Sequence, residues 1–337
     1  RLDHRSEADG AAANLINAVF LDALKAMASD IHIESTPHGL SLKFRVDGLL
    51  ETMQTVNGRP LAEQVLSRLK VLANLDIAER RRPQDGRFRA ERRGRTIDVR
   101  LSIMPSIHGE DAVLRLLDKS SLVAPGEQLT LEALGFDATD LVRLRNLARL
   151  PYGMLLVTGP TGSGKTTTLY AVLSEINTGR DKIVTIEDPV EYQLSGVLQV
   201  PVNEKKGLTF AVGLRSILRH DPDRIMVGEI RDTETADIAV QAALTGHLVL
   251  TTVHANNVFD VIGRFTHMGI DPYTLVSALT GIWAQRLMRR VCPECAEPRT
   301  FADDELAEVG SSHLLNPARW MTARGCSSCR GTGYRGR

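Results

Sequence analysis

Apolar residues in the first third of the chain follow a helical period and then the alternation that is typical of strands. Residues 7–28 carry apolar side chains at i, i+3 and i+4 spacing, which predicts an amphipathic helix. Asp47-Gly48 separates two alternating runs and is a signal for a tight hairpin. We expect a compact α+β domain over residues 1–118. Its other elements are a helix at 61–75 and strands at 31–33, 40–46, 49–53, 87–90, 96–103 and 112–117.

The pattern changes after a stretch without periodicity. Residues 119–130 contain Ser, Pro and Gly and predict a linker that could act as a hinge. From residue 131 to residue 287, short apolar runs alternate with helical patterns, which indicates a mostly parallel sheet covered on both faces. Residues 288–337 form a small appendage. Strands are expected at 155–158, 183–186, 225–227 and 248–252, and helices at 164–176, 209–219, 233–244 and 257–267.

Composition narrows the class of protein. The 337 residues are 43% hydrophobic and 24% charged, as in ordinary globular domains. No apolar run approaches the length of a transmembrane helix. Lys plus Arg and Asp plus Glu are equal at 41 each, so no net charge favours nucleic acid. Because the chain starts at Arg1 and ends in a Gly-rich run, we expect it to be a fragment.

One octet carries the strongest chemical signal. Residues 159–166 read GPTGSGKT, which fits the phosphate-binding loop G-x-x-x-x-G-K-[S/T]. The glycines let backbone N–H groups turn toward a polyphosphate, Lys165 supplies a charge for the β- and γ-phosphates, and Thr166 supplies a hydroxyl for Mg²⁺. An apolar strand precedes the loop and a helix follows it, as this chemistry requires. The predicted ATP-binding residues are Gly159, Pro160, Thr161, Gly162, Ser163, Gly164, Lys165, Thr166 and Thr167.

Acidic residues follow two of the predicted core strands. Residues 224–232 read RIMVGEIRD, and we expect Glu229 to orient or deprotonate the attacking water. A surface glutamate paired with Arg231 is the alternative. In TIEDPVEY, Glu187 lies at the end of a strand, where the ligand crevice of a parallel sheet is found, so a catalytic role is predicted for it. A solvated acidic loop is the alternative there.

Histidines and arginines supply further candidates. His247 precedes the predicted strand at 248–252 and His254 follows it, and only His254 lies at the carboxyl end, where it could sense a γ-phosphate. Structural histidines are the alternative reading of both. Eight arginines occur in residues 79–95, where a solvated hairpin face is the simpler interpretation. Arg100 and Arg115 lie within predicted strands, where a charge needs a partner.

Four cysteines occur as two C-x-x-C pairs, Cys292 with Cys295 and Cys326 with Cys329. This spacing predicts a tetrahedral, structural zinc site, because four thiolates leave no open coordination position. Reduced thiols or disulfides are the alternatives.

These blocks occur in the order found in the ATPases of bacterial type II secretion and type IV pilus assembly, which the chain resembles. Further matching segments are ASDIHIE, FRVDG, KVLANLDIAERRRPQDGR, IDVRLSIMPSIHGE, VLRLLDK and GHLVLTTVHAN. The resemblance implies a PAS-like first domain and a RecA-like ATPase domain with a zinc module. It also implies a homo-hexamer on the cytoplasmic face of the bacterial inner membrane, where it would meet inner-membrane platform proteins. By the same resemblance, Arg100 and Arg115 approach the nucleotide phosphates.

We therefore expect an ATPase motor that powers assembly of a pseudopilus for type II secretion, with type IV pilus assembly as the alternative. A nucleic-acid translocase is less favoured. Aromatic residues, which would stack on bases, make up only 4% of the chain, and the chain has no net positive charge to bind a phosphate backbone. A scaffold that binds ATP without turnover is a third possibility.

Overall fold

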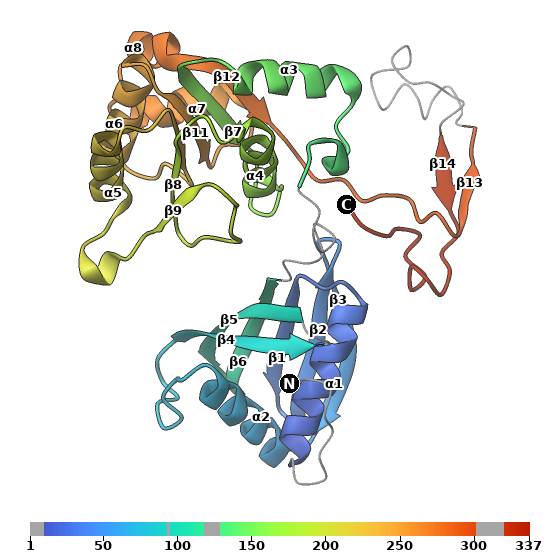
Figure 1. Cartoon of the computed structure of the whole chain (residues 1–337). Coiled ribbons are helices and arrows are strands. Elements are labelled where there is room, and N and C mark those ends of the chain that lie inside the picture. Colours follow the sequence, from blue (N-terminus) through green and yellow to red (C-terminus); the bar gives the residue numbers. More distant parts are fainter. Residues whose placement is uncertain (1–9, 93–94, 118–128, 301–319) are drawn as a thin grey trace. The chain divides into compact units, whose positions relative to one another are not determined.

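The structure is a computed structural model that describes residues 10–92, 95–117, 129–300 and 320–337 (Figure 1). Residues 119–128 of the expected linker lie outside these ranges. The chain divides into two compact units. The first unit contains Arg1–Asp118 together with Met288–Arg337, and the second contains Lys119–Leu287.

The first unit is built on an antiparallel sheet packed against two helices. Its strands lie in the order β3-β2-β1-β6-β5-β4, and the predicted hairpin at Asp47-Gly48 joins β2 to β3. Both turn residues have positive φ, 49° and 88°, as a two-residue type I′ turn requires. The elements are α1 (Ala11–Lys25), β1 (Asp30–Thr36), β2 (Gly39–Val46), β3 (Leu49–Asn57), α2 (Arg59–Leu72), β4 (Gln84–Arg92), β5 (Arg95–Ser106) and β6 (Gly109–Leu117).

One face of this sheet buries its apolar residues against the helices. Phe20 of α1 and Leu69 of α2 belong to the same buried cluster as Ile31, Phe44 and Leu101 of the strands. Because side chains alternate along a strand, the residues between them lie on the opposite face of the sheet. That second face carries two of the predicted site residues, Arg100 and Arg115.

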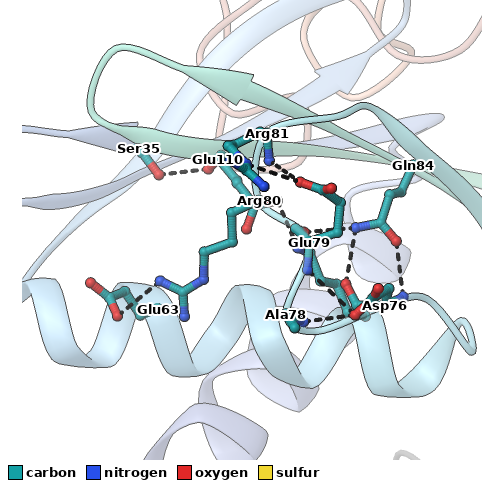
Figure 2. Close-up of polar contacts among 10 residues, drawn as sticks. Ser35, Glu63, Asp76, Ala78, Glu79, Arg80, Arg81, Gln84 and Glu110 are labelled. Carbon is teal, nitrogen blue, oxygen red and sulfur yellow. Dashed lines mark hydrogen bonds and ion pairs between the residues drawn. The ribbon is translucent and has the colours of Figure 1, made fainter.

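Polar contacts fix the loop that joins α2 to β4 (Figure 2). The amide of Gln84 donates to the carbonyl oxygens of Asp76 (3.0 Å) and Glu79 (2.9 Å), and Asp76 in turn accepts the backbone N–H of Ala78. The ammonium of Lys70 donates to the Glu79 carbonyl oxygen of this loop (2.6 Å) and lies 2.7 Å from the Glu110 carboxylate, and the Lys70 and Glu110 side chains are buried. The first arginines of the 79–95 run are therefore presented by an ordered loop.

The second unit contains a sheet in which every strand pair is parallel, and this confirms the predicted α/β fold. Its order is β12-β7-β11-β10-β8-β9. The elements are α3 (Ala138–Ala148), β7 (Gly153–Thr158), α4 (Lys165–Ile176), β8 (Ile183–Glu187), β9 (Leu198–Pro201), α5 (Phe210–Ile217), β10 (Arg224–Val227), α6 (Thr233–Leu244), β11 (Leu248–Val253), α7 (Val258–His267), α8 (Pro272–Ala278) and β12 (Leu279–Ala284).

The sheet of the second unit is apolar on both faces. All six residues of β7 and of β11 are buried, and two separate hydrophobic clusters take alternate residues of these strands. Residues of α4 belong to one cluster and residues of α5, α6, α7 and α8 to the other. Helices on both sides thus leave the ends of the strands as the accessible part of the sheet.

The cysteine segment contains a short antiparallel pair, β13 (Ala296–Pro298) and β14 (Met321–Ala323). Most of the residues between the two strands lie outside the described ranges. Among the residues that are described, no helix combines the length and the apolar character needed to cross a membrane.

Candidate functional site

The phosphate-binding loop connects β7 to α4 at the carboxyl end of the parallel sheet. Gly159, Gly162 and Gly164 adopt φ values of 146°, 74° and 85°, which are strained for residues with a Cβ atom. Ligand crevices of parallel sheets lie at this end of the strands. The local sequence therefore produces the backbone that a phosphate loop needs.

The helix that follows the loop begins differently from its neighbours. In α3, α5, α6, α7 and α8, a side chain at the N-cap accepts a backbone N–H of the first turn; these caps are Asp137, Thr209, Asp232, Asn257 and Asp271. In α4 the N-cap is Gly164, which has no side chain to accept one. The amino end of α4 is thus left for an anion, which its N–H groups and helix dipole favour.

Lys165 is held inside the loop. Its side-chain nitrogen donates to the carbonyl oxygens of Gly159 (3.0 Å) and Pro160 (3.1 Å), and the residue is only 8% exposed. Burial lowers the pKa of Lys165, and the negative charge of Glu229 opposes this effect. The hydroxyl oxygen of Ser163 is buried without a hydrogen-bond partner among the described residues. A cation and an unsatisfied hydroxyl therefore line the loop, and both suit phosphate oxygens.

Thr161, Gly162 and Thr166 are exposed, and Thr167 is half-buried. Thr166 stands in the first turn of α4, where its hydroxyl can ligate a Mg²⁺ ion bound with the phosphates. The loop N–H groups, the Lys165 ammonium and the Thr166 hydroxyl therefore suit a nucleotide with its metal ion.

Strand β11 lies between β7, which leads into the phosphate loop, and β10, which is followed by Glu229. The hydroxyl of Thr158, the last residue of β7, lies 3.0 Å from the Val253 carbonyl oxygen and 2.8 Å from that of Ala255. The hydroxyl of Thr252 donates to the carbonyl oxygen of Gly228 (2.8 Å). The carboxyl ends of β7, β11 and β10 are thus joined by side chains as well as by the sheet.

Glu229 lies between two potential cations at this edge. One carboxylate oxygen accepts a hydrogen bond from Arg231, and the other lies 3.0 Å from Nε2 of His254. The hydrogen bond with Glu229 raises the pKa of Arg231. The pairing of Glu229 with Arg231 was expected only if Glu229 were a surface glutamate without a catalytic role. The negative charge of the same carboxylate also opposes the lowering of the Lys165 pKa by burial. The structure thus brings Glu229 and His254 together at the carboxyl end of the sheet that also carries the phosphate loop.

Glu187 is placed more deeply than the sequence indicated. It is 2% exposed and accepts hydrogen bonds from Tyr170, Thr185 (2.5 Å) and Gln199 (3.0 Å). Burial raises the pKa of Tyr170, and its hydrogen bond to Glu187 adds to the shift. Glu187 therefore fastens α4 and β9 to the end of β8, while a catalytic role for it stays a prediction.

His247 stands apart from these residues. Its carbonyl oxygen accepts the N–H of Gly153, the first residue of β7, whereas the phosphate loop follows Thr158, the last. Nδ1 of the ring lies 3.1 Å from the Ala242 carbonyl oxygen. The length of β11, about 20 Å for six residues, separates His247 from His254.

Arg100 and Arg115 lie directly opposite each other on β5 and β6, on the sheet face away from the buried cluster. The register places Arg87 of β4 opposite Arg100, and Asp30 of β1 opposite Arg115. Arg45 of β2 follows opposite Asp30. We call these five residues the arginine row. Nε of Arg115 donates to the Asp30 carboxylate at 2.9 Å.

Sequence reasoning missed Gln285, which directly follows β12. Its amide nitrogen donates to the Ser163 carbonyl oxygen (2.7 Å), and its amide oxygen accepts the Thr168 hydroxyl (2.9 Å). The apolar run before it, LTGIWA, is interrupted by Thr and Gly, so neither the strand nor the residue after it stood out.

The four cysteines form one cluster. Their sulfur atoms all lie within 4.8 Å of one another, and three pairs are separated by 3.8–3.9 Å. A tetrahedron with Zn–S bonds of about 2.3 Å has edges of about 3.8 Å, whereas a disulfide would need about 2.05 Å. Backbone N–H groups of Cys326 and Gly333 donate to Cys329 and lower the pKa of its thiol to about 6. Four cysteines in this arrangement fit a metal ion.

Comparison with known proteins identifies related chains. The family model described as "Type II/IV secretion system protein" matches residues 5–337. The chain is 53% identical over 323 residues to the putative type II secretion system protein E of Escherichia coli strain K12, covering 96% of this chain and 64% of that protein. It is 50% identical to the type II secretion system ATPase E of Vibrio cholerae, covering 98% of this chain and 65% of that protein.

A pilus protein is also related. The type IV pilus assembly ATPase PilB of Myxococcus xanthus is 46% identical, with 98% of this chain and 58% of that protein covered. The chain therefore spans roughly 58–65% of the length of these relatives.

Two solved structures have similar folds. The pilus retraction motor PilT with bound ADP matches with a TM-score of 0.58 and 30% identity, covering 82% of this chain and 79% of that one. The Legionella pneumophila ATPase DotB matches with a TM-score of 0.66 and 21% identity, covering 86% of this chain and 79% of that one, which bears on the fold alone.

Proposed function

The chain belongs to the family of type II/IV secretion system proteins, and on this premise we propose that it is the ATP-hydrolysing part of a secretion motor. One observation carries the proposal: the uncapped phosphate loop, with Lys165 inside it, and Glu229 with His254 lie at the carboxyl end of the same parallel sheet. Relatives named as ATPases support the activity.

In the proposed mechanism, the residues of the second unit divide the work. The loop N–H groups and Lys165 bind the phosphates of ATP, and the Thr166 hydroxyl would hold a Mg²⁺ ion, which would supply neutralising charge to them. Glu229 accepts the proton of the attacking water or orients that water, and His254 fixes the orientation of the carboxylate. For Arg100 and Arg115 of the first unit, stabilisation of the phosphate charge during transfer stays a prediction from the family resemblance.

The four cysteines would hold a structural zinc ion, which we infer from their sulfur separations. The zinc ion would supply a fixed cross-link in a segment whose described part has only one short strand pair. It would take no part in hydrolysis, because four thiolates complete its coordination.

At the level of the assembly, we propose a homo-hexamer on the cytoplasmic face of the inner membrane that acts on platform proteins of a type II secretion system. The similarity to two proteins named for type II secretion supports this choice. The 46% identity to PilB keeps type IV pilus assembly as the second candidate. Deleting the gene distinguishes them, since loss of secreted proteins with pili intact supports secretion and the reverse supports pilus assembly.

The activity is tested by Lys165→Ala in the intact protein, with phosphate release measured in the presence of Mg²⁺ and ATP. Loss of one charge that contacts the β- and γ-phosphates should remove nearly all hydrolysis. Hydrolysis by the variant at the wild-type rate would refute the proposal. Nucleotide binding with no turnover in the wild-type protein would instead identify a nucleotide-gated scaffold.

A further inference from the structure

Gln285 uses all of its hydrogen-bonding side-chain atoms on the phosphate loop and the helix after it. The side-chain amide spans Ser163 and Thr168, and the backbone N–H donates to the Thr158 carbonyl oxygen (3.0 Å). The residue therefore touches the loop where it begins, near its end and in the first turn of α4. The mechanism of hydrolysis proposed above gives no role to these three contacts of Gln285.

The backbone of Gln285 also lies against the loop. A Cβ atom on Gly159 would come within 2.3 Å of the Gln285 carbonyl oxygen, which is closer than real Cβ atoms occur. A Cβ atom on Gly164 would come within 3.3 Å of its side-chain nitrogen. The residue after β12 thus leaves no room for a side chain at Gly159 and little room at Gly164.

The bond to Ser163 determines which way one peptide group of the loop faces. In a trans peptide the C=O of one residue and the N–H of the next point in opposite directions. Because Gln285 holds the Ser163 carbonyl oxygen on its own side, the N–H of Gly164 must point away from Gln285. N–H groups of such loops cradle the phosphates of the nucleotide.

We propose that Gln285 is a positioning residue that holds the phosphate loop in its phosphate-binding conformation. The proposal rests on the function proposed above and adds a residue 122 positions away from the loop carbonyl that it holds. Gln285 acts through the backbone rather than on the γ-phosphate, so it should affect ADP and ATP alike.

The experiment compares Gln285→Ala with Thr280→Val in the intact protein. Thr280 lies on β12, the strand that precedes Gln285, and its hydroxyl donates to the Met154 carbonyl oxygen (3.0 Å), so Thr280→Val removes a hydrogen bond at the other end of β7. Gln285→Ala should raise the dissociation constants of both ADP and ATP roughly tenfold, as expected for two lost hydrogen bonds. Thr280→Val should leave both constants unchanged.

A second variant covers the case in which Gln285→Ala does not fold. Thr168→Val removes one of the two side-chain bonds and keeps the bond to Ser163, so a smaller increase in the same direction is expected for both nucleotides.

Wild-type affinity for ADP in folded Gln285→Ala overturns the inference, as does an equal loss in Thr280→Val. An effect on ATP alone would also overturn it, because Gln285 would then act on the γ-phosphate. Lys165→Ala separates this result from the proposed function. If Lys165→Ala loses hydrolysis while Gln285→Ala behaves as wild type, only the role of Gln285 fails.

Discussion

The substitution Gly159→Ala tests how tightly the phosphate loop is packed. The new methyl group would lie 2.3 Å from the Gln285 carbonyl oxygen and 2.7 Å from the Ser163 hydroxyl oxygen, against a practical minimum of 3.0 Å. The carbonyl belongs to the backbone, so about 0.7 Å of movement must come from the chain itself. That movement would disturb the bonds from Gln285 to Thr158 and Ser163.

The size of the effect follows from two contributions. Gly159 has a φ of 146°, outside the left-handed helical region, and a residue with a Cβ atom in that conformation costs about 1–3 kcal/mol. Two weakened hydrogen bonds add about 0.5–1.5 kcal/mol each. About 3 kcal/mol in total corresponds to roughly a hundredfold loss of nucleotide affinity. The cost appears as lost affinity because the nucleotide binds the native conformation of the loop, which the substitution destabilises.

Gly162→Ala is the matched control in the same loop. Gly162 has a φ of 74°, and a Cβ atom there meets nothing within 4 Å. Only the backbone cost of about 1–2 kcal/mol applies, which predicts a loss of about 5- to 30-fold. Isothermal titration with ADP measures both variants. Equal affinities would refute the argument that contact with Gln285 constrains the loop.

Two further predictions concern the proposed chemistry and the cysteine cluster. Glu229→Gln should retain nucleotide binding and lose about 10²–10⁴-fold in kcat, because the amide cannot accept the water proton; unchanged phosphate release would exclude Glu229 as the base. Zinc content, measured by atomic absorption after dialysis, should approach one ion per chain at pH 7.5. It should fall on acidification, because protons compete with the metal ion for the cysteine thiolates. Retention of the ion at pH 4 would contradict this.

The phosphate loop could be predicted from sequence because its chemistry is local. Eight consecutive residues specify the turn, the charge and the hydroxyl, and the flanking apolar runs specify the strand and the helix. The parallel sheet could be predicted equally well from the sequence, since strands buried on both faces are nearly continuous apolar runs. The strands β9 and β12 were missed because their short sequences lack such a run.

Contacts between distant residues could not be predicted from one sequence. Gln285 meets Ser163 across 122 positions, and no periodicity encodes that pairing. Glu187 was expected in an open crevice, but Tyr170 and Gln199 enclose it from neighbouring elements. The alignment of Arg87 and Arg45 with Arg100 depends on the register of four strand pairs, which the alternation of side chains leaves undetermined.

The arginine row has a consequence for the stability of the first unit. Arg87, Arg100 and Arg115 occupy neighbouring strands about 4.8 Å apart, and like charges directly opposite each other weaken a sheet. At physiological ionic strength the screening length is about 8 Å, so dissolved monovalent salt removes only part of this repulsion. Asp30 lies between Arg115 and Arg45 in the row and forms ion pairs with both. The register thus concentrates positive charge on this face of the sheet, and a multivalent anion lying across the strands would reduce the repulsion between these arginines.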